Sequence, residues 1–303
     1  MSAPRAATTL PPVVLLRVTF RVLTDGLLPA LPTTALHGAL ARALWREVCV
    51  APARPTCRGC PVEHTCAYPR LFDPAALAVG GVRELGVTGE VPRALWIAPE
   101  PPLVPTGGRP FPVEGAQEIA FRIGLAEFAL DTLPALRRAL RRVARRGFGP
   151  PGRALQMDLL AVAPLNGAAL GAPLPEVCVE FFTPVRLKHA GKIEAEPDAE
   201  LLVQSLVRRA RLLAAAGAAA WRPPFDVATV ANSLGLRRDL RVVDVSRYSA
   251  RQHARLTWPG LIGTIHLDGP GLADLWPLLR WGEGAQIGKA TTFGFGRYVL
   301  RCP

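Results

Sequence analysis

One order of elements occurs twice along this chain, and it restricts the possible folds more than any other feature of the sequence. Runs of β-branched and large apolar residues predict strands, and apolar residues three and four positions apart predict helices. In the first half the order is strand, helix, two strands, helix and strand, at about residues 13–23, 33–48, 94–98, 118–129, 133–146 and 155–162. In the second half the same order recurs, at about residues 177–187, 199–218, 240–245, 261–267, 272–281 and from 298 onward. The sequence therefore predicts an α+β chain with two tandem ferredoxin-like β-α-β-β-α-β domains.

A short segment rich in Gly and Pro separates the two halves. The stretch "NGAALGAPLP", residues 166–175, has no helical or strand periodicity and is typical of a linker. We therefore place an N-terminal domain at 1–165 and a C-terminal domain at 176–303. The first domain carries a Cys-rich insertion at 49–72, and the second carries a Gly-rich loop before its last strand. Thr33 or Thr34 is expected to cap the first helix.

The chain is strongly basic, with 36 Lys and Arg against 24 Asp and Glu and a formal net charge of +12. This excess of cations predicts a polyanionic partner, either a nucleic acid or an acidic membrane surface. The first apolar run, residues 13–20, is interrupted by Arg17 and is too short to span a bilayer. We therefore expect a cytoplasmic protein that does not enter a membrane, with its six cysteines as reduced thiols or metal ligands.

The stretch "GKATTFGFGRY", residues 288–298, combines glycines with cations just before the last strand. A Gly-rich turn exposes backbone N–H groups, which together with neighbouring cations favour a phosphate-bearing ligand. A simple β-turn without a ligand is the alternative. The second helix of the first half also precedes a Gly/Arg segment, and its outer face is either a nucleic-acid track or an ordinary solvated surface. That face carries six arginines: Arg137, Arg138, Arg141, Arg142, Arg145 and Arg146.

Four cysteines fall within the stretch "CVAPARPTCRGCPVEHTC", namely Cys49, Cys57, Cys60 and Cys66. The Cys57-x2-Cys60 spacing places two thiolates for one tetrahedral ion, and the outer two cysteines can complete the site, with His64 as a substitute for either. Structural zinc is the favoured interpretation, ahead of an iron–sulfur cluster, and reduced thiols in a loop are the alternative. A closed four-ligand site has no open position, so this metal would stabilise the insertion and take no part in catalysis.

Several motifs occur in an order that is similar to one known family. They are "HGALARALW", "RRGFGPPGR", "FFTPVRLKHAGK", "SRYSARQ", "GLIGTIHLDG" and "IGKATTFGFGRY". The chain resembles the CRISPR-associated endoribonucleases of the RAMP superfamily that process precursor CRISPR RNA, in particular a subgroup with cysteines after the first helix. The resemblance covers about residues 13–300 and is most specific in the C-terminal third. It implies two ferredoxin-like (RRM-like) domains, in agreement with the order of the elements.

The resemblance also implies an activity. Family members cleave within the repeat of a precursor RNA without a metal ion, by attack of the 2′-hydroxyl on the adjacent phosphate. The products carry a 2′,3′-cyclic phosphate and a 5′-hydroxyl end. The implied partners are the CRISPR repeat RNA, or the mature CRISPR RNA, and subunits of a CRISPR effector complex. No cofactor is expected for the cleavage. The absence of an RNP1-type pattern indicates that RNA binds the Gly-rich loop and the groove between the domains rather than the face of the sheet.

Such cleavage needs a base for the 2′-OH proton, an acid for the leaving oxygen and cations for the charge that develops on the phosphate. Histidine suits the role of base near neutral pH. Family members often keep a histidine near the first helix, which makes His37 the first candidate, and the helix dipole there favours the neutral ring. His253, which follows "SRYSARQ", is the second candidate. We expect His189 at the surface or on the RNA, His266 within a strand and His64 beside the cysteines.

Lys289, Arg247 and Arg251 are the candidates for stabilising the developing charge, and Tyr248 is the candidate for stacking on a base or for hydrogen bonding. The resemblance implies that further RNA-binding residues lie in the Gly-rich loop and in the "VRLK" stretch: Gly288, Gly294, Gly296, Arg297, Arg186 and Lys188. For each cation alone a solvated surface charge is the simpler interpretation. The cluster as a whole favours RNA.

Two other functions stay open at this point. The family loop often has a histidine where this chain has Gln286, which fits a non-cleaving subunit that holds a processed RNA within an effector complex. The third interpretation is a zinc-stabilised adaptor that binds protein rather than RNA. Phosphate contacts weaken steeply with salt, so the salt dependence of partner binding distinguishes this adaptor from an RNA-binding protein.

Overall fold

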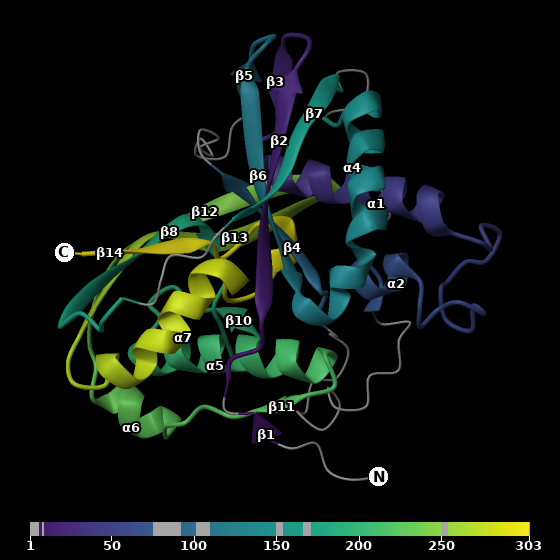
Figure 1. The fold of residues 1–303 in the computed structure, drawn as a ribbon. Coiled ribbons are helices and arrows are strands. Elements are labelled where there is room, and N and C mark those ends of the chain that lie inside the picture. Colours follow the sequence, from purple (N-terminus) through teal and green to yellow (C-terminus); the bar gives the residue numbers. More distant parts are fainter. Residues whose placement is uncertain are drawn as a thin grey trace. The chain divides into compact units, whose positions relative to one another are not determined.

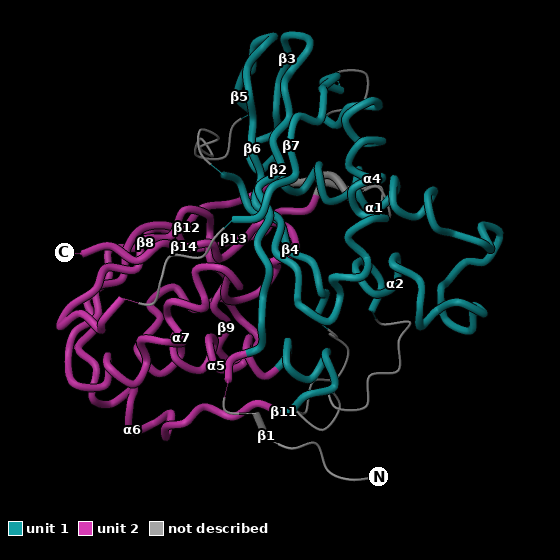
Figure 2. Tube along the Cα trace, viewed as in Figure 1, with its two compact units in different colours: residues 1–5, 11–165, 212–220 teal, residues 6–10, 166–211, 221–303 magenta. Residues whose placement is uncertain are grey.

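The computed structural model of the chain describes residues 6–7, 9–74, 92–100, 110–149, 154–165, 171–249 and 254–302, with only the backbone of 6–7, 247–249 and 254–255 (Figure 1). The chain forms two compact units (Figure 2). Unit 1 comprises residues 1–5, 11–165 and 212–220, and unit 2 comprises residues 6–10, 166–211 and 221–303. Each unit contains one four-stranded antiparallel sheet.

Unit 1 has the β-α-β-β-α-β order with a few short additions. Its elements are β2 (Val13–Val22), β3 (Gly26–Leu28), α1 (Pro32–Val48), α2 (Ala67–Leu71), β4 (Leu95–Glu100), β5 (Phe111–Val113), β6 (Glu118–Ala126), the 3₁₀ helix η2 (Glu127–Thr132), α4 (Leu133–Arg146) and β7 (Met157–Leu165). The main sheet has the order β4-β6-β2-β7, so the first and third strands of the motif lie in the middle. This is the ferredoxin-like arrangement, which confirms the predicted fold class for this half.

The core of unit 1 lies between the helices and the sheet. Leu36, Leu40 and Leu44 recur at helical spacing on α1 and are fully buried, as the periodicity predicts. Phe20 on β2 and Phe121 on β6 pack edge to face, with their ring centroids 6.2 Å apart. The aromatic pair therefore packs across the two central strands, on the face of the sheet that the helices cover.

Helix α1 begins at Pro32, and neither Thr33 nor Thr34 is its N-cap. Leu31 occupies that position, and its side chain makes no capping hydrogen bond. Proline suits the first turn because its fixed φ is helical and its missing N–H has no partner there in any case. Thr34 Oγ1 instead donates to the Leu31 carbonyl at 2.8 Å. The predicted threonine cap is therefore wrong.

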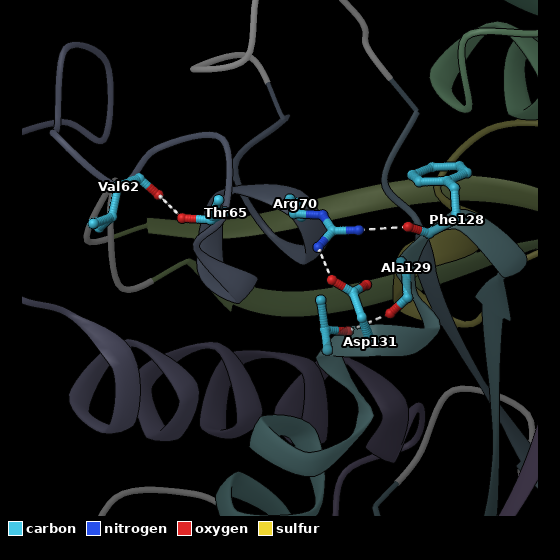
Figure 3. Close-up of polar contacts among 7 residues, drawn as sticks. Val62, Thr65, Arg70, Phe128, Ala129 and Asp131 are labelled. Carbon is cyan, nitrogen blue, oxygen red and sulfur yellow. Dashed lines mark hydrogen bonds and ion pairs between the residues drawn. The ribbon is translucent and has the colours of Figure 1, made fainter.

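The short elements of unit 1 were not predicted from the sequence. β3 and β5 form a two-stranded ribbon in which Gly26 pairs with Val113. Arg70 on α2 donates to Asp131 Oδ2 at 2.5 Å and to the Phe128 carbonyl, so it fastens α2 to η2 (Figure 3). Elements of three to five residues span too few positions for a periodicity to be recognised.

Unit 2 repeats the order and the sheet arrangement. Its elements are β8 (Glu176–Val185), β9 (Lys188–His189), β10 (Lys192–Ile193), α5 (Ala199–Ala216, whose last turn belongs to unit 1), α6 (Val227–Asn232), β12 (Gly235–Ser249), β13 (Ala254–Asp268), α7 (Leu272–Ala285), the 3₁₀ helix η3 (Thr291–Phe293) and β14 (Tyr298–Arg301). Two two-residue strands, β1 (Ala6–Ala7) and β11 (Ala220–Trp221), complete the chain. The sheet order is β12-β13-β8-β14, which confirms a second ferredoxin-like fold.

Strands β12 and β13 form a hairpin much longer than the sequence pattern predicted. Each strand has 15 residues, and their pairing runs from Gly235 opposite Asp268 to Ser249 opposite Ala254. The added parts carry exposed polar and charged residues such as Arg237 and Asp239. Such residues lack the alternation of a half-buried strand, which is why the pattern ended early.

Helix α7 and strand β14 fix the ends of the Gly-rich loop. Tyr298 at the start of β14 is fully buried, and its hydroxyl donates to the Leu279 carbonyl of α7 at 2.6 Å. Arg209 of α5 is buried beside α7 and donates through Nε to the Ala285 carbonyl at 3.0 Å. Burial lowers the pKa of Arg209 to about 10. Within the described ranges, no helix has the length and apolar character needed to cross a membrane.

Candidate nucleic-acid interface

The Gly-rich loop, residues 286–297, connects α7 to β14 and is hydrogen-bonded to the end of β8. The Lys289 N–H donates to the Arg186 carbonyl at 3.0 Å, and the Gly296 N–H donates to the Pro184 carbonyl at 2.9 Å. The Arg297 N–H donates to Thr183 Oγ1 at 2.9 Å. Because Thr183 is fully buried, these bonds hold the loop against an ordered strand end.

Gly288 and Gly296 are required by the fold of this loop itself. Both have positive φ, at 77° and 74°. A Cβ at Gly296 would lie 1.9 Å from the Ile287 carbonyl oxygen, and a Cβ at Gly288 would lie 2.7 Å from the Arg186 carbonyl oxygen. Gly294 also has positive φ, at 98°, and follows η3. The backbone that approaches Gly288 and Gly296 is thus the protein's own, and an RNA contact at the three glycines stays a prediction.

Two residues other than glycine also have a positive φ in this loop, Gln286 at 58° and Ala290 at 65°. Gln286 is only 1% exposed, and neither its amide nitrogen nor its amide oxygen has a hydrogen-bond partner in the described part of the chain. Strained backbone and unsatisfied buried polar groups both cost stability, and they concentrate at functional sites. Strain of this kind is typical of functional loops, and the binding of a phosphate-bearing ligand by this loop stays a prediction.

An aromatic cluster adjoins the loop, and sequence reasoning missed it. The ring of Trp258 on β13 lies 5.2 Å from Phe293 and 5.8 Å from Phe295, between centroids. The Arg186 guanidinium lies over the Trp258 ring at 5.5 Å and over the Phe295 ring at 6.0 Å. The alternation of aromatic residues with glycines in "FGFG" was the available signal, but the position of Trp258 depends on sheet pairing.

The cations predicted at this site have different environments. Arg186 is half-buried, and burial lowers its pKa from the usual value. Lys289 is half-buried beside it, whereas Lys188 on β9 is exposed. Arg297 is only 3% exposed, and its guanidinium lies 5.3 Å from the centre of the Phe182 ring. The burial of Arg297 favours a structural role for its side chain.

The remaining C-terminal candidates lie in or near the turn of the long hairpin. Arg247 and Tyr248 are residues of β12, where they pair with Leu256 and Arg255 on β13. Arg251 and His253 lie outside the described residues. The proposed roles of these four side chains stay predictions.

The side of the unit 2 sheet that carries Glu176 and Glu180 presents ion pairs. Glu176 Oε1 accepts from Arg237 at 2.5 Å, and Glu180 Oε2 accepts from Arg301 at 2.9 Å. These ion pairs do not test where RNA binds, and contact with the loop rather than with the sheet stays a prediction.

His37 lies in the second turn of α1, in unit 1. Its side chain is more buried than its position in the sequence indicated, at 8% exposed. Its ring packs edge to face on Phe72, with centroids 5.1 Å apart. The segment after α2 supplies this covering ring, so only the tertiary structure shows that His37 is shielded.

The other described histidines lie at the surface. His189 on β9 is exposed, as expected, and so is His64, whose Nε2 lies 3.3 Å from Glu63 Oε1. His266 on β13 is partly exposed, with Nδ1 4.0 Å from Glu176 Oε1. None of these three positions shows the enclosed geometry of a general base.

Helix α4 has the predicted bounds and presents the predicted arginine face. Leu136, Leu140 and Val143 are buried, and all six arginines except the half-buried Arg142 are exposed. Glu47 on α1 accepts from Arg138 at 2.7 Å and lies 3.6 Å from Arg142. One carboxylate thus neutralises part of the face, and the rest keeps its positive charge.

The four cysteines of the insertion lie near one another, without a metal-binding arrangement among the described side chains. Cys49 follows α1, Cys66 precedes α2, and all four thiols are half-buried outside disulfides. The pKa of Cys57 rises to about 11, first through burial and then through Asp73 and the other three thiols. Nevertheless, no group of three or more His, Cys, Asp or Glu side chains in the described segments could hold a metal ion. The geometry gives the zinc prediction no support.

Comparison with known families assigns both halves of the chain. The family AF_1859_N, described as an N-terminal domain, matches residues 10–172, more than half of the chain. The model of the CRISPR-associated endoribonuclease Cas6 matches residues 179–298, which include β8, the long hairpin and the Gly-rich loop. Residues 10–172 thus belong to the AF_1859_N family, and residues 179–298 match the Cas6 endoribonuclease family. The predicted family is therefore confirmed, whereas the Cys-containing subgroup stays a prediction.

Solved structures of Cas6 and related RAMP proteins share this fold over nearly the whole chain. A Thermus thermophilus Cas6 product complex has a TM-score of 0.56 at 16% identity and covers 96% of this chain and 100% of that one. A RAMP protein that binds different RNA substrates has a TM-score of 0.54 at 12% identity, with 95% and 100% covered. A Cas6-related protein from Pyrococcus furiosus has a TM-score of 0.53 at 7% identity, with 96% and 99% covered. No curated protein sequence matches the chain.

Proposed function

We propose that this chain cleaves precursor CRISPR RNA within its repeat, without a metal ion, by attack of a 2′-hydroxyl on the adjacent phosphate. The products carry a 2′,3′-cyclic phosphate and a 5′-hydroxyl end. Because the nucleophile belongs to the RNA, the protein needs only to transfer protons and to stabilise negative charge. The chain retains the RNA or passes it to a CRISPR effector complex.

The match of residues 179–298 to the Cas6 endoribonuclease family carries this proposal. The structural support comes from the Gly-rich loop, in which the Lys289 N–H donates a hydrogen bond to the Arg186 carbonyl. Two cations on adjacent, ordered backbone suit a phosphate whose charge grows in the transition state. The net charge of +12 favours the approach of a polyanion.

His37 is the first candidate for the base, and His253 is the second. His37 lies in the second turn of α1, and a neutral imidazole there could accept the 2′-hydroxyl proton. Its contact with Phe72 means that this ring must become more exposed before it can reach a 2′-hydroxyl. Lys289 stabilises the charge on the phosphate in either case.

The burial of His37 also favours the second candidate function, a non-cleaving subunit that holds processed RNA. A ring that is 8% exposed and covered by Phe72 is an ordinary core histidine unless RNA binding uncovers it. Binding through the arginine face and the Gly-rich loop does not require a base.

A cleavage assay in EDTA separates the two functions. Purified chain is mixed with repeat RNA, and with the same RNA carrying a single 2′-deoxy nucleotide at each position in turn. Cleavage in EDTA that one 2′-deoxy substitution abolishes, with a cyclic phosphate found by mass spectrometry, supports the proposal. Tight binding of all RNAs without any cut supports the non-cleaving subunit.

Variants then assign the roles. We expect His37→Ala to abolish cleavage and Lys289→Ala to slow it about 100-fold. His64→Ala, an exposed histidine beside the cysteines, serves as the matched control and cleaves as the parent chain does. Retained cleavage by His37→Ala would transfer the role of base to His253.

A further inference from the structure

A partly buried aromatic cluster on unit 2 has no role in the chemistry proposed above. Trp258 and Phe293 are half-buried, whereas Phe295 is fully buried. The ring planes of Trp258 and Phe293 meet at 62° and those of Trp258 and Phe295 at 64°. Edge-to-face packing of this kind holds a ring in one orientation. The cluster thus presents an ordered aromatic surface rather than a mobile side chain.

The fold brings this surface to the Gly-rich loop. A Cβ at Gly260 would lie 2.9 Å from Pro184 Cβ and 3.2 Å from the Val185 carbonyl oxygen, so only glycine lets β13 pass β8 this closely. Trp258 lies two residues before Gly260, and Val245 on β12 is its pairing partner. Because β13 pairs antiparallel with β8, with Leu261 opposite Val185, this close approach places the indole beside Arg186, where β8 ends.

Positive charge lies directly on the cluster. The Arg186 guanidinium lies 5.5 Å from the centre of the Trp258 ring, and burial lowers the pKa of Arg186. Arg186 Nε is buried and has no hydrogen-bond partner among the residues that the structure describes. A desolvated guanidinium without a carboxylate gains from a nearby anion. An aromatic surface next to cations is complementary to a nucleotide, whose base stacks and whose phosphate is negative.

We propose that Trp258, Phe293 and Arg186 form a site in which one unpaired nucleobase of the RNA stacks on the aromatic rings while its phosphate lies against Arg186 and Lys289. This inference rests on the proposed function, because it takes the ligand to be the repeat RNA. It adds a specific demand on the substrate: a single-stranded nucleotide must lie at the loop, since a base within a duplex cannot expose its face.

The test combines abasic RNA with a tryptophan variant. Fluorescence anisotropy gives the affinity for repeat RNA in which one nucleotide at a time lacks its base. We expect the affinity of the parent chain to fall about tenfold or more when the base is missing at one unpaired position. A loss of this size is typical of a base that stacks on an aromatic side chain. Trp258→Leu should bind intact RNA as weakly as the parent chain binds that abasic RNA. Removing the same base from the RNA should then cause no further loss of affinity in the variant.

Two further variants make the test independent of folding. Trp258→Tyr keeps an aromatic face and should retain most of the affinity and the abasic effect. Trp281→Leu, which changes a half-buried tryptophan on α7, should bind every RNA as the parent chain does. Circular dichroism melting confirms that each variant is folded.

The stacking site is wrong if Trp258→Leu binds intact RNA as tightly as the parent chain, or if it loses affinity at every abasic position to the same degree. A parent chain that binds and cleaves repeat RNA while showing either result contradicts only the stacking site. A parent chain that binds no repeat RNA contradicts the proposed function as well.

Discussion

At the scale of single residues, the Gly-rich loop depends on backbone conformations that only glycine adopts without strain. Gly296 combines φ of 74° with a Cβ position 1.9 Å from the Ile287 carbonyl oxygen. We expect Gly296→Ala to lower the free energy of unfolding by about 2 kcal/mol or more, because backbone must move in addition to the conformational cost. Urea denaturation followed by circular dichroism measures this loss.

Gly191→Ala is the matched control for this prediction. Gly191 has φ of 83° in the exposed turn between β9 and β10, and a Cβ there would meet nothing within 4 Å. Only the conformational cost of about 1 kcal/mol applies at this position. Equal losses in the free energy of unfolding for the two variants would show that the close contact at Gly296 does not contribute to the loss.

The buried hydroxyl of Thr183 gives a second prediction at this scale. It accepts the hydrogen bond from the Arg297 N–H, and Thr183 is fully buried. Thr183→Val keeps the shape but removes the acceptor, so we expect a loss of about 1–3 kcal/mol in the free energy of unfolding. Thr183→Ser keeps the hydroxyl and should lose clearly less in the same denaturation experiment. The reverse order would mean that packing of the methyl group, rather than the hydrogen bond, holds the loop.

At the scale of elements, one ion pair links α2 to η2. The hydrogen bond from Arg70 lowers the pKa of Asp131 (Figure 3). A carboxylate whose pKa is lower in the folded state contributes stability above its unfolded pKa, and this contribution disappears as the pH falls through the folded pKa. Asp131 is largely exposed, so the contribution is small, well under 1 kcal/mol.

Asp131→Asn tests this link. Urea denaturation should show the variant slightly less stable than the parent chain at pH 7, because a neutral amide accepts more weakly from a guanidinium. The difference should shrink as the pH falls from about 4, the pKa of the unfolded carboxyl, through the lower pKa of the folded carboxyl. A difference that stays constant with pH would assign it to packing instead.

At the scale of the whole molecule, positive charge determines how RNA affinity responds to salt. The exposed face of α4 includes Arg141 and Arg145, which no described carboxylate pairs with. If this face contacts phosphates, Arg141→Glu with Arg145→Glu should reduce the slope of log affinity against log salt by about 0.7 or more for each lost contact. Binding titrations between low and moderate salt give the slope.

The control changes the net charge by the same amount elsewhere. Arg208 on α5 and Arg222 after β11 are exposed in unit 2, and their replacement by Glu alters the molecule's total charge equally. A contact on α4 predicts a smaller slope for the α4 variant alone. Equal slopes for both variants would show that overall charge, and not the α4 face, sets the salt dependence.

The sequence by itself determined the features that neighbouring residues encode. The repeated order of elements, the bounds of α4 and the buried leucines of α1 follow from periodicities of two and of three to four residues, which act within a single element. The motifs at the C-terminal end were sufficient to predict the family, which the Cas6 match then confirmed.

Only the tertiary structure decided what surrounds the candidate site. Arg186, Trp258 and Phe293 lie together because β13 pairs with β8 in one register and the loop is hydrogen-bonded to the end of β8. No local sequence pattern specifies that register. For the same reason the structure alone revealed that Arg297 is buried, that Phe72 covers His37, and that the loop glycines accommodate the protein's own backbone. Contacts between residues distant in sequence depend on how whole elements pack, whereas the periodicity of one segment determines only which of its faces becomes buried.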